Sequence, residues 1–232
     1  MSNNNDSPII WYVPGFRSGD DHQIDVRQIL RKIYPNAEDF ELIKWEFQNV
    51  TLSSFIVENI GFLRFGPLGI PSAAINMVMS RWRKALADIK PTSDRLVNKI
   101  RYLPSSKRQK LILIGHSLGG NIVIRTLAHL YRRNLSIHSA VLLGAAIDNR
   151  SEDILWAMKS TQSPIYSMIN PQDYALETFR IVTGSRALGT GCDLAYDHTK
   201  FREYQIPGST DHSSSFYLTQ WGYRKKILFD LG

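Results

Sequence analysis

Short apolar runs alternate along the chain with segments of helical periodicity. The run Ile9–Val13 predicts a strand that is buried on both faces. Apolar residues then recur at helical spacing between Val26 and Ile33, and Pro35 closes the predicted helix. Residues 40–47 read as a second strand. Because strand, helix and strand follow one another in this way, the first part of the chain predicts an α/β sheet.

The same alternation continues to the end of the chain. Apolar runs predict further strands at 111–114, 137–146, 164–169 and 203–206. Helices are predicted after residue 117, from 151 towards 158, and over 174–182 and 212–223, with a glycine-rich loop at 184–192. The 232 residues contain no internal repeat. We therefore expect a single domain over 1–232, with a mostly parallel central sheet flanked by helices.

The stretch 111–120 reads Leu-Ile-Leu-Ile-Gly-His-Ser-Leu-Gly-Gly and combines a buried strand with a G-x-S-x-G motif. In this context Ser117 is the candidate nucleophile, placed at a sharp turn from strand to helix. The flanking glycines have a steric reason, because side chains beside such a strained turn would collide with the adjacent strand and helix. The motif predicts an α/β-hydrolase fold.

A serine hydroxyl needs an imidazole to accept its proton and a carboxylate to orient that imidazole. In this fold the chain order is serine, acid, histidine. His212 follows the last predicted strand and is the expected base, with His198 as the alternative. Asp173 follows the strand at 164–169 and is the expected acid, with Asp148, one strand earlier, as the alternative. Chain order leaves both alternatives open.

Two backbone amides complete the expected site. Gly15 directly follows the end of the first predicted strand, where a small residue lets backbone amides face a ligand. An early strand with a glycine loop is where hydrolases with a later serine turn supply one oxyanion donor. The other donor is the amide after the nucleophile. We therefore expect the N–H groups of Phe16 and Leu118 to hold the oxyanion.

An apolar segment at 52–79 stands apart from the rest of the chain. Between residues 60 and 79 the only charge is Arg64, yet Pro67 and Pro71 disfavour a membrane-spanning helix. We expect a cap or lid-like insertion around 52–79 that defines an acyl-binding pocket, with plain core packing as the alternative.

Positive charge is concentrated next to this apolar segment. The chain has a net charge of +7, and residues 81–110 contain ten Lys or Arg against Asp88 and Asp94. The ordinary interpretation of such a stretch is a solvated helix face. The alternative is peripheral contact with an anionic membrane through 52–110, because apolar and basic surfaces lie side by side there. We expect no nucleic-acid partner.

Cys192 is the only cysteine, which excludes an intramolecular disulfide and a cysteine-built metal site. The serine chemistry requires no metal or organic cofactor, so none is expected. The first seven residues are polar and show no secretory signal pattern. We expect a cytoplasmic protein, with peripheral membrane association or non-classical export as alternatives.

The motifs together resemble the α/β-hydrolase superfamily, and more narrowly the hydrolase family typified by transmembrane and coiled-coil domain protein four. The matching pieces are Val13-Pro14-Gly15-Phe16 with Asp20-Asp21, the Lys44-Trp45-Glu46 strand end, the apolar segment before the basic helix, Gly-His-Ser-Leu-Gly, Leu142-Leu143-Gly144-Ala145, and Tyr166-Ser167 leading to Asp173. The resemblance implies Ser117, Asp173 and His212 as nucleophile, acid and base.

The expected activity is that of a serine esterase or lipase acting on a lipid or other small acyl ester. Thioesterase and amidase activities use the same machinery, and the motifs do not separate them. A different class is also consistent with the fold, namely a catalytically silent module that binds membranes or a protein partner. The ordered serine, acid and histidine favour the enzyme.

Overall fold

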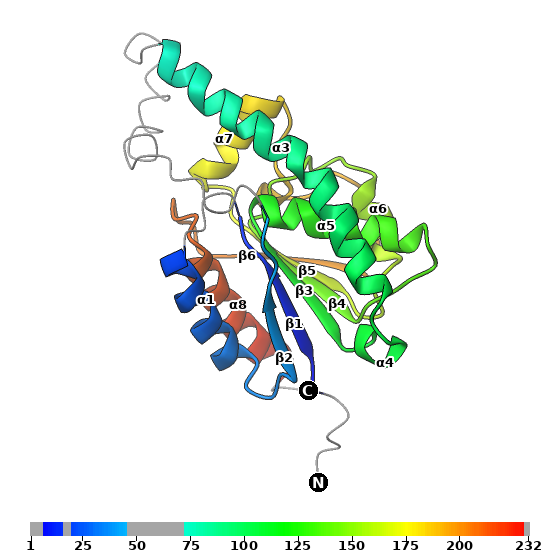
Figure 1. Cartoon of the computed structure of the whole chain (residues 1–232). Coiled ribbons are helices and arrows are strands. Elements are labelled where there is room, and N and C mark those ends of the chain that lie inside the picture. The colour runs from blue at the N-terminus through cyan, green and yellow to red at the C-terminus, as the bar shows by residue number, and fades with distance from the viewer. Residues whose placement is uncertain (1–6, 16–19, 46–71, 230–232) are drawn as a thin grey trace.

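The computed structural model describes residues 7–15, 20–45 and 72–229 (Figure 1). In these residues six parallel strands form one sheet in the order β2-β1-β3-β4-β5-β6. The strands are β1 (Ile9–Val13), β2 (Asp39–Leu42), β3 (Leu111–His116), β4 (Ser139–Leu143), β5 (Ile165–Ile169) and β6 (Phe201–Gln205). The predicted α/β class and the parallel sheet are confirmed.

Helices cover both faces of the sheet. They are α1 (Asp20–Ile33), α3 (Ser72–Arg101), α4 (Ser105–Arg108), α5 (Leu118–Tyr131), α6 (Asp153–Met158), α7 (Tyr174–Thr183) and α8 (Ser214–Phe229), with a 3₁₀ turn, η4, at Leu188–Thr190. Figure 1 shows α1 and α8 side by side on one face, while α3, α5 and α6 lie on the other. A sheet covered in this way buries its inner strands, which is why β1, β3, β4 and β5 read as apolar runs, whereas the edge strands β2 and β6 keep partly exposed polar residues.

The central strand β3 divides the core into two halves. Leu111 and Leu113 belong to the cluster formed with α3 and α5. Ile112 and Ile114 point the other way, into the cluster that contains Trp221 of α8. This alternation follows from the two-residue period of a strand. Each fully buried aliphatic side chain contributes about 1.5–3 kcal/mol, so both halves stabilise the sheet.

Several predicted boundaries differ from the observed ones. The strand predicted at 40–47 ends at Leu42, although the Ile43 amide still donates to the Tyr12 carbonyl at 2.8 Å. The strand predicted at 137–146 spans only Ser139–Leu143, because Gly144 has a φ of +53°, which breaks the extended backbone. The last helix begins at Ser214, and His212 therefore lies in the loop before it. Periodicity locates elements better than it locates their ends.

The apolar segment at 52–79 is only partly described. Residues 72–79 form the first turns of α3, the 30-residue helix that crosses the sheet. Residues 52–71 lie outside the described residues, and the cap or lid around 52–79 stays a prediction. Within the described ranges, no helix combines the length and the apolar character needed to cross a bilayer.

Candidate active site

Ser117 occupies the sharp turn between β3 and α5. Its φ of 54° and ψ of −124° lie in a region that residues with a side chain rarely adopt. Neighbouring strands hold the turn: the Ser117 amide donates to the Leu143 carbonyl at 3.0 Å, and the Ser117 carbonyl accepts from the Ala146 amide at 2.9 Å. Strain at one residue persists because the surrounding structure determines the backbone on both sides.

The motif glycines are required by close packing. A Cβ atom on Gly119 would lie 2.1 Å from the Val13 carbonyl oxygen, and one on Gly115 would lie 2.6 Å from the Gly119 carbonyl oxygen. Both obstacles are backbone atoms, which cannot move aside as a flexible side chain can. Helix α5 therefore starts directly against the carboxyl end of β1. The close approach agrees with the prediction that side chains at these glycine positions would collide with the adjacent strand and helix.

Asp173 and His212 are in direct contact although 39 residues separate them. Nδ1 of His212 lies 2.5 Å from Oδ2 of Asp173. The Asp173 side chain is fully buried, whereas 21% of the His212 side chain is exposed. A carboxylate on one imidazole nitrogen selects the tautomer and leaves the other nitrogen to accept a proton.

Asp173 is placed by the sheet and by the helix that follows it. It comes just after β5 and caps the N-terminus of α7, where its Oδ1 accepts the amides of Ala175 at 2.9 Å and Leu176 at 3.3 Å. A helix N-terminus is a favourable place for a negative charge. The cap fixes the carboxylate so that Oδ2 faces the loop that carries His212.

Tyr217 is a residue of the site that the sequence analysis missed. Its hydroxyl donates to Oδ2 of Asp173 at 2.7 Å, next to the His212 contact. Burial raises the pKa of the Tyr217 phenol well above its ordinary value, and the nearby Asp173 charge raises it further. The phenol is therefore protonated and can only donate to the carboxylate. In the sequence Tyr217 reads as one more apolar position of the last helix, so no signal separates it from core residues.

His116, the residue before the nucleophile, packs against the candidate base. The His116 and His212 rings have centroids 4.8 Å apart. Nδ1 of His116 lies 3.2 Å from the hydroxyl of Ser214, the first residue of α8. These contacts bring His212 alongside the Ser117 turn.

A second missed residue, Asn170, joins the acid loop to the histidine loop. The buried side-chain amide of Asn170 donates to the Ser209 carbonyl at 2.6 Å, and the backbone N–H of Asn170 donates to the Gly189 carbonyl at 2.8 Å. Gln172 also packs against this loop, since a Cβ on Gly208 would lie 2.5 Å from Oε1 of Gln172. The backbone on both sides of the Asp173–His212 contact is therefore held by direct packing.

The alternative acid and base make other contacts. Asp148 is half-buried, and its Oδ1 accepts the Arg150 amide at 2.9 Å in a local turn. His198 is exposed and packs on the Tyr196 ring, with centroids 4.7 Å apart. The contacts described for these two side chains are thus with residues other than Asp173 and His212.

The two expected oxyanion donors differ in how far the structure describes them. Leu118 is the first residue of α5, where backbone N–H groups have no partner within the helix. Phe16 lies outside the described residues. The preceding Gly15 adjoins the serine turn, because a Cβ added to it would lie 2.8 Å from Cβ of Ser117. The end of β1 is thus close to the candidate nucleophile.

Cys192 contacts other residues: its amide donates to Oε1 of Glu203 at 2.9 Å, and its thiol lies 3.6 Å from the Asn149 carbonyl oxygen. Burial raises the pKa of the Cys192 thiol to about 11.

In the part of the chain that the structure describes, no group of three His, Cys, Asp or Glu side chains is placed to hold a metal ion.

The parallel sheet, the strained serine turn after β3 and the order of the elements define an α/β-hydrolase fold. The model of the family Lecithin:cholesterol acyltransferase matches residues 68–174, a region that includes the Ser117 turn and Asp173. No curated protein sequence matches the chain. The family match and the fold together support a hydrolase of the α/β type.

Solved structures share this fold at low sequence identity. A hyperthermophilic esterase from the archaeon Pyrobaculum calidifontis aligns with 96% of this chain and 77% of its own, at 11% identity and a TM-score of 0.51. An uncharacterized protein from Bacillus cereus aligns with 100% of this chain and 62% of its own, at 9% identity and a TM-score of 0.50. At these identities the likeness establishes the fold alone.

Proposed function

We propose that the protein is a serine hydrolase that cleaves a carboxylic ester, with an acyl lipid as the substrate class. The observation that carries this proposal is the 2.5 Å contact between Nδ1 of His212 and Oδ2 of Asp173, with the imidazole packed beside the strained Ser117 turn. A buried carboxylate on an imidazole, with a serine at a strained turn close by, is the arrangement that nucleophilic acyl chemistry needs.

In the proposed reaction His212 removes the proton from the Ser117 hydroxyl as the serine oxygen attacks the ester carbonyl. Asp173 orients His212 and stabilises its protonated form. The amides of Leu118 and Phe16 donate to the oxyanion of the tetrahedral intermediate. When the intermediate collapses, the alcohol leaves with the proton from His212. Water then attacks the acyl-serine by the same steps and releases the acid.

The proposed substrate class rests on the matched family and on the apolar segment. That family is named for acyl transfer involving lecithin and cholesterol, which is chemistry at a lipid acyl ester. The segment at 52–79, with Arg64 as the only charge between 60 and 79, offers apolar length for an acyl chain. Esters therefore rank above thioesters and amides, which the same residues can attack.

Active-site labelling tests the nucleophile. A fluorophosphonate probe should label the wild type and fail on Ser117→Ala. Ser167→Ala is the matched control, because Ser167 is a fully buried serine of β5 in the same sheet. Equal labelling of the wild type and Ser117→Ala would exclude Ser117 as the nucleophile.

Substrate assays test the reaction. A panel of esters graded by acyl length, with matched thioesters and amides, should show Ser117-dependent turnover that is highest for an ester. Higher turnover of a thioester or amide would reassign the reaction within the same machinery. A wild type that neither turns over any of the three classes nor takes the label would favour the catalytically silent module.

A further inference from the structure

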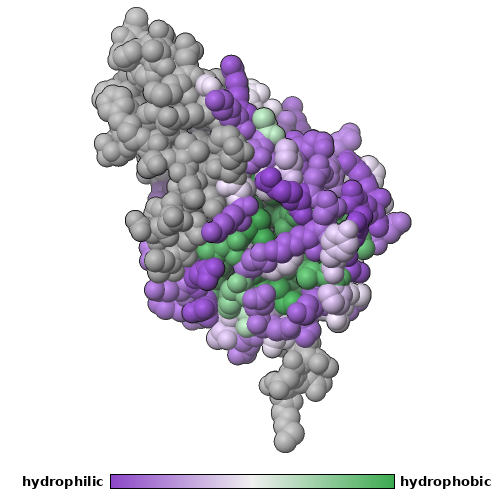
Figure 2. Space-filling view, in the orientation of Figure 1, coloured by the Kyte–Doolittle hydropathy of each residue, from purple (hydrophilic) through white to green (hydrophobic). Residues whose placement is uncertain are grey.

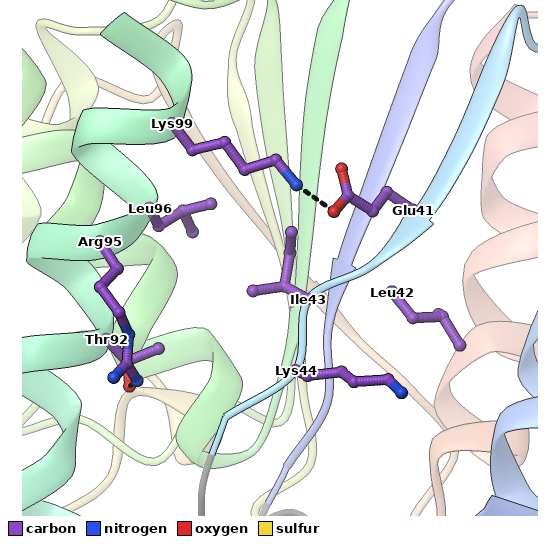
Figure 3. A pocket seen from close by; sticks show the side chains of 8 residues that line it. All are labelled: Glu41, Leu42, Ile43, Lys44, Thr92, Arg95, Leu96 and Lys99. Carbon is purple, nitrogen blue, oxygen red and sulfur yellow. Dashed lines mark hydrogen bonds and ion pairs between the residues drawn. The ribbon is translucent and has the colours of Figure 1, made fainter. Parts of the chain in front are cut away.

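The groove between α3 and β2 holds its own charges in pairs. In Figure 3 the Lys99 ammonium reaches from α3 to the Glu41 carboxylate of β2. Arg95 donates to the Thr92 hydroxyl at 2.7 Å. Lys44 points away from this groove, towards the side of the sheet that carries α1 and α8. In Figure 2 hydrophilic side chains cross the apolar surface on the α3 side of the molecule.

Further cations of the basic stretch also have counter-charges. Lys110 and Lys107 lie 3.6 Å and 4.0 Å from the Glu38 carboxylate. Lys90 pairs with Asp94 at 2.8 Å. Exposed pairs of this kind add little stability, but they cancel charge locally. The sequence therefore overstates the uncompensated charge at 81–110.

The opposite face of the sheet, which α1 and α8 cover side by side (Figure 1), carries cations without such partners. There is no acidic residue in α8 or at positions 26–33 of α1. Asp39 of β2 shares its strand face with Glu41, on the α3 side. Five cations of the two helices form no ion pair with a carboxylate in the described part of the chain: Arg27, Arg31, Lys32, Arg224 and Lys226.

The last turns of α1 and α8 meet, so their cations belong to one surface. A Cβ on Gly222 would lie 3.2 Å from Cγ1 of Ile33, and the Lys225 ammonium donates to the Ile33 carbonyl at 3.0 Å. Both helices pack on the same face of the sheet, so their outer sides look in the same direction. Arg31 and Lys226 lie within one turn of these contacts and are exposed.

Two large apolar side chains are exposed on the same part of α8. Tyr223 is 63% exposed and Ile227 is 53% exposed. Four residues separate them, so they are neighbours on the helix surface. Tyr217 and Trp221, on the other side of the helix, are buried against the sheet. A helix that only covers a core needs apolar residues on one face, and the outer pair lies on the face that the core does not use.

The helix dipole is the ordinary explanation for cations near the C-terminus of a helix, because they compensate the last carbonyl groups. It accounts for Arg31 and Lys226, which lie in the last turns of their helices. It does not account for exposed Tyr223 and Ile227 beside them. A tyrosine and an aliphatic residue among basic side chains are typical of a helix at a membrane interface.

We propose that the outer sides of α1 and α8 dock the protein on an anionic membrane. Arg31, Lys32 and Lys226 contact lipid phosphates, and Tyr223 and Ile227 enter the headgroup region. An acidic protein would also match the charge. A lipid surface fits better, because the cations are spread along two neighbouring helices and no pocket gathers them around one partner group.

The proposed surface borders the candidate site at one end. Helix α8 begins at Ser214, whose hydroxyl lies 3.2 Å from Nδ1 of His116, next to the nucleophile. Phe216 is seven residues before Tyr223 and continues the outer apolar row towards this end. A bilayer along α8 therefore reaches the edge of the sheet that carries Ser117. Only this consequence rests on the proposed function.

Co-sedimentation with vesicles tests the charged part of the surface. The full chain is mixed with phosphatidylcholine vesicles that contain or lack phosphatidylglycerol, at low and high salt. The test variant is Arg31→Glu with Lys226→Glu, one cation from each helix. The matched control is Arg83→Glu with Lys84→Glu, which makes the same change in charge at exposed positions of α3. This control also tests contact through the basic stretch.

A second pair of variants tests the apolar part. Tyr223→Ser with Ile227→Ser removes the two exposed apolar side chains of α8. Tyr102→Ser with Ile181→Ser is the matched control, because these two residues are 77% and 52% exposed outside α1 and α8. All four side chains are exposed, so the variants should fold as the wild type does, which circular dichroism checks.

Wild type and both controls should bind the phosphatidylglycerol vesicles and release them at high salt. The charge variant should bind about tenfold more weakly, and the apolar variant several-fold more weakly. Equal loss in a variant and its control, full binding by the apolar variant, or equal binding to both kinds of vesicle would overturn the proposal. A wild type that binds no vesicles would overturn it too, and binding of poly-glutamate would then assign the surface to an acidic protein.

The vesicle assay requires no turnover, so its result is independent of the proposed hydrolysis. Fluorophosphonate labelling of all four variants should equal that of the wild type, because none of the changed residues contacts Ser117. If the charge reversals unfold the protein, Arg31→Gln with Lys226→Gln replaces them, compared with Arg83→Gln and Lys84→Gln, and the same direction of effect is expected.

Discussion

The Tyr217 hydroxyl donates a hydrogen bond of 2.7 Å to Oδ2 of Asp173, the same oxygen that His212 contacts at 2.5 Å. With two amides on Oδ1, the buried carboxylate accepts from both of its oxygens. Burying a charge is costly unless such partners compensate it. Tyr217 therefore has two tasks in the proposed mechanism, to compensate the buried charge and to hold Oδ2 in line with His212.

Tyr217→Phe removes the phenol donor and keeps the ring. We expect kcat/KM on an ester substrate to fall about tenfold, and the free energy of unfolding to fall by about 1–2 kcal/mol, because the carboxylate loses a partner while buried. Steady-state kinetics and thermal denaturation measure the two effects.

Tyr34→Phe is the matched control for that variant. Tyr34 is also a buried tyrosine whose hydroxyl has one partner on α8, the Trp221 indole at 3.0 Å. Tyr34→Phe should lower the free energy of unfolding by a similar amount and leave kcat/KM nearly unchanged. Equal activity losses in the two variants would show that Tyr217 acts only through stability.

Asn170→Ala should loosen the loop that carries His212. The substitution removes the 2.6 Å bond to the Ser209 carbonyl, three residues before His212. We expect a several-fold loss of kcat with little change in KM, because the base is less often in place. Asn149→Ala is the control, since Asn149 is equally buried and its amide bonds the Gly191 carbonyl at 3.0 Å in another loop. A comparable loss of kcat in both variants would contradict the role of Asn170.

Gly119→Ala should damage the protein far more than Gly184→Ala. A methyl group on Gly119 would meet the Val13 carbonyl at 2.1 Å, which forces α5 away from β1, at an expected cost of about 3 kcal/mol. Gly184 has a φ of +77° and open space around it, so alanine there costs only the backbone strain of about 1 kcal/mol. Chemical denaturation measures the free energy of unfolding of both variants. Similar losses in Gly119→Ala and Gly184→Ala would mean that α5 can shift away from β1 and accommodate the methyl group.

The single thiol should react slowly in the folded protein. Burial raises the pKa of Cys192 to about 11 from an ordinary value of 9.0, so only about one thiol in a thousand is ionised at pH 8. Labelling by iodoacetamide should accelerate about tenfold for each pH unit up to pH 11. Urea-unfolded protein should label rapidly at pH 8, and native protein that labels as fast would contradict the burial.

The raised pKa of Cys192 also makes the free energy of unfolding depend on pH in a defined direction. Because the folded-state pKa of Cys192 is the higher one, its contribution to stability is complete below pH 9 and is lost as the pH rises towards 11. Cys192→Ala should remove this part of the alkaline decline. Denaturation curves measured across that range, for wild type and variant, compare the two slopes.

Local signals in the sequence predict most of the fold. Unbroken apolar runs identify β1, β3, β4 and β5 because a parallel sheet covered on both faces has no polar side. The boundaries are less certain, since a single backbone angle, such as φ of +53° at Gly144, ends a strand within an apolar run. The assignments of nucleophile, base and oxyanion donors stay predictions until they are tested by the variants above.

The serine turn is the feature that the sequence determines by itself, because strand, glycines and helix are neighbours in the chain and their sterics are local. Chain order left Asp148 and His198 open as acid and base, and only the tertiary structure shows that Asp173 and His212 are in contact. Asp173 meets His212 because β5 and the last loop end at the same edge of the sheet, and Tyr217 and Asn170 enter the site from elements whose sequences look like ordinary core and turn. Glu41 likewise meets Lys99 across 58 residues. Contacts between distant segments depend on how the sheet is assembled, and no local pattern carries that information.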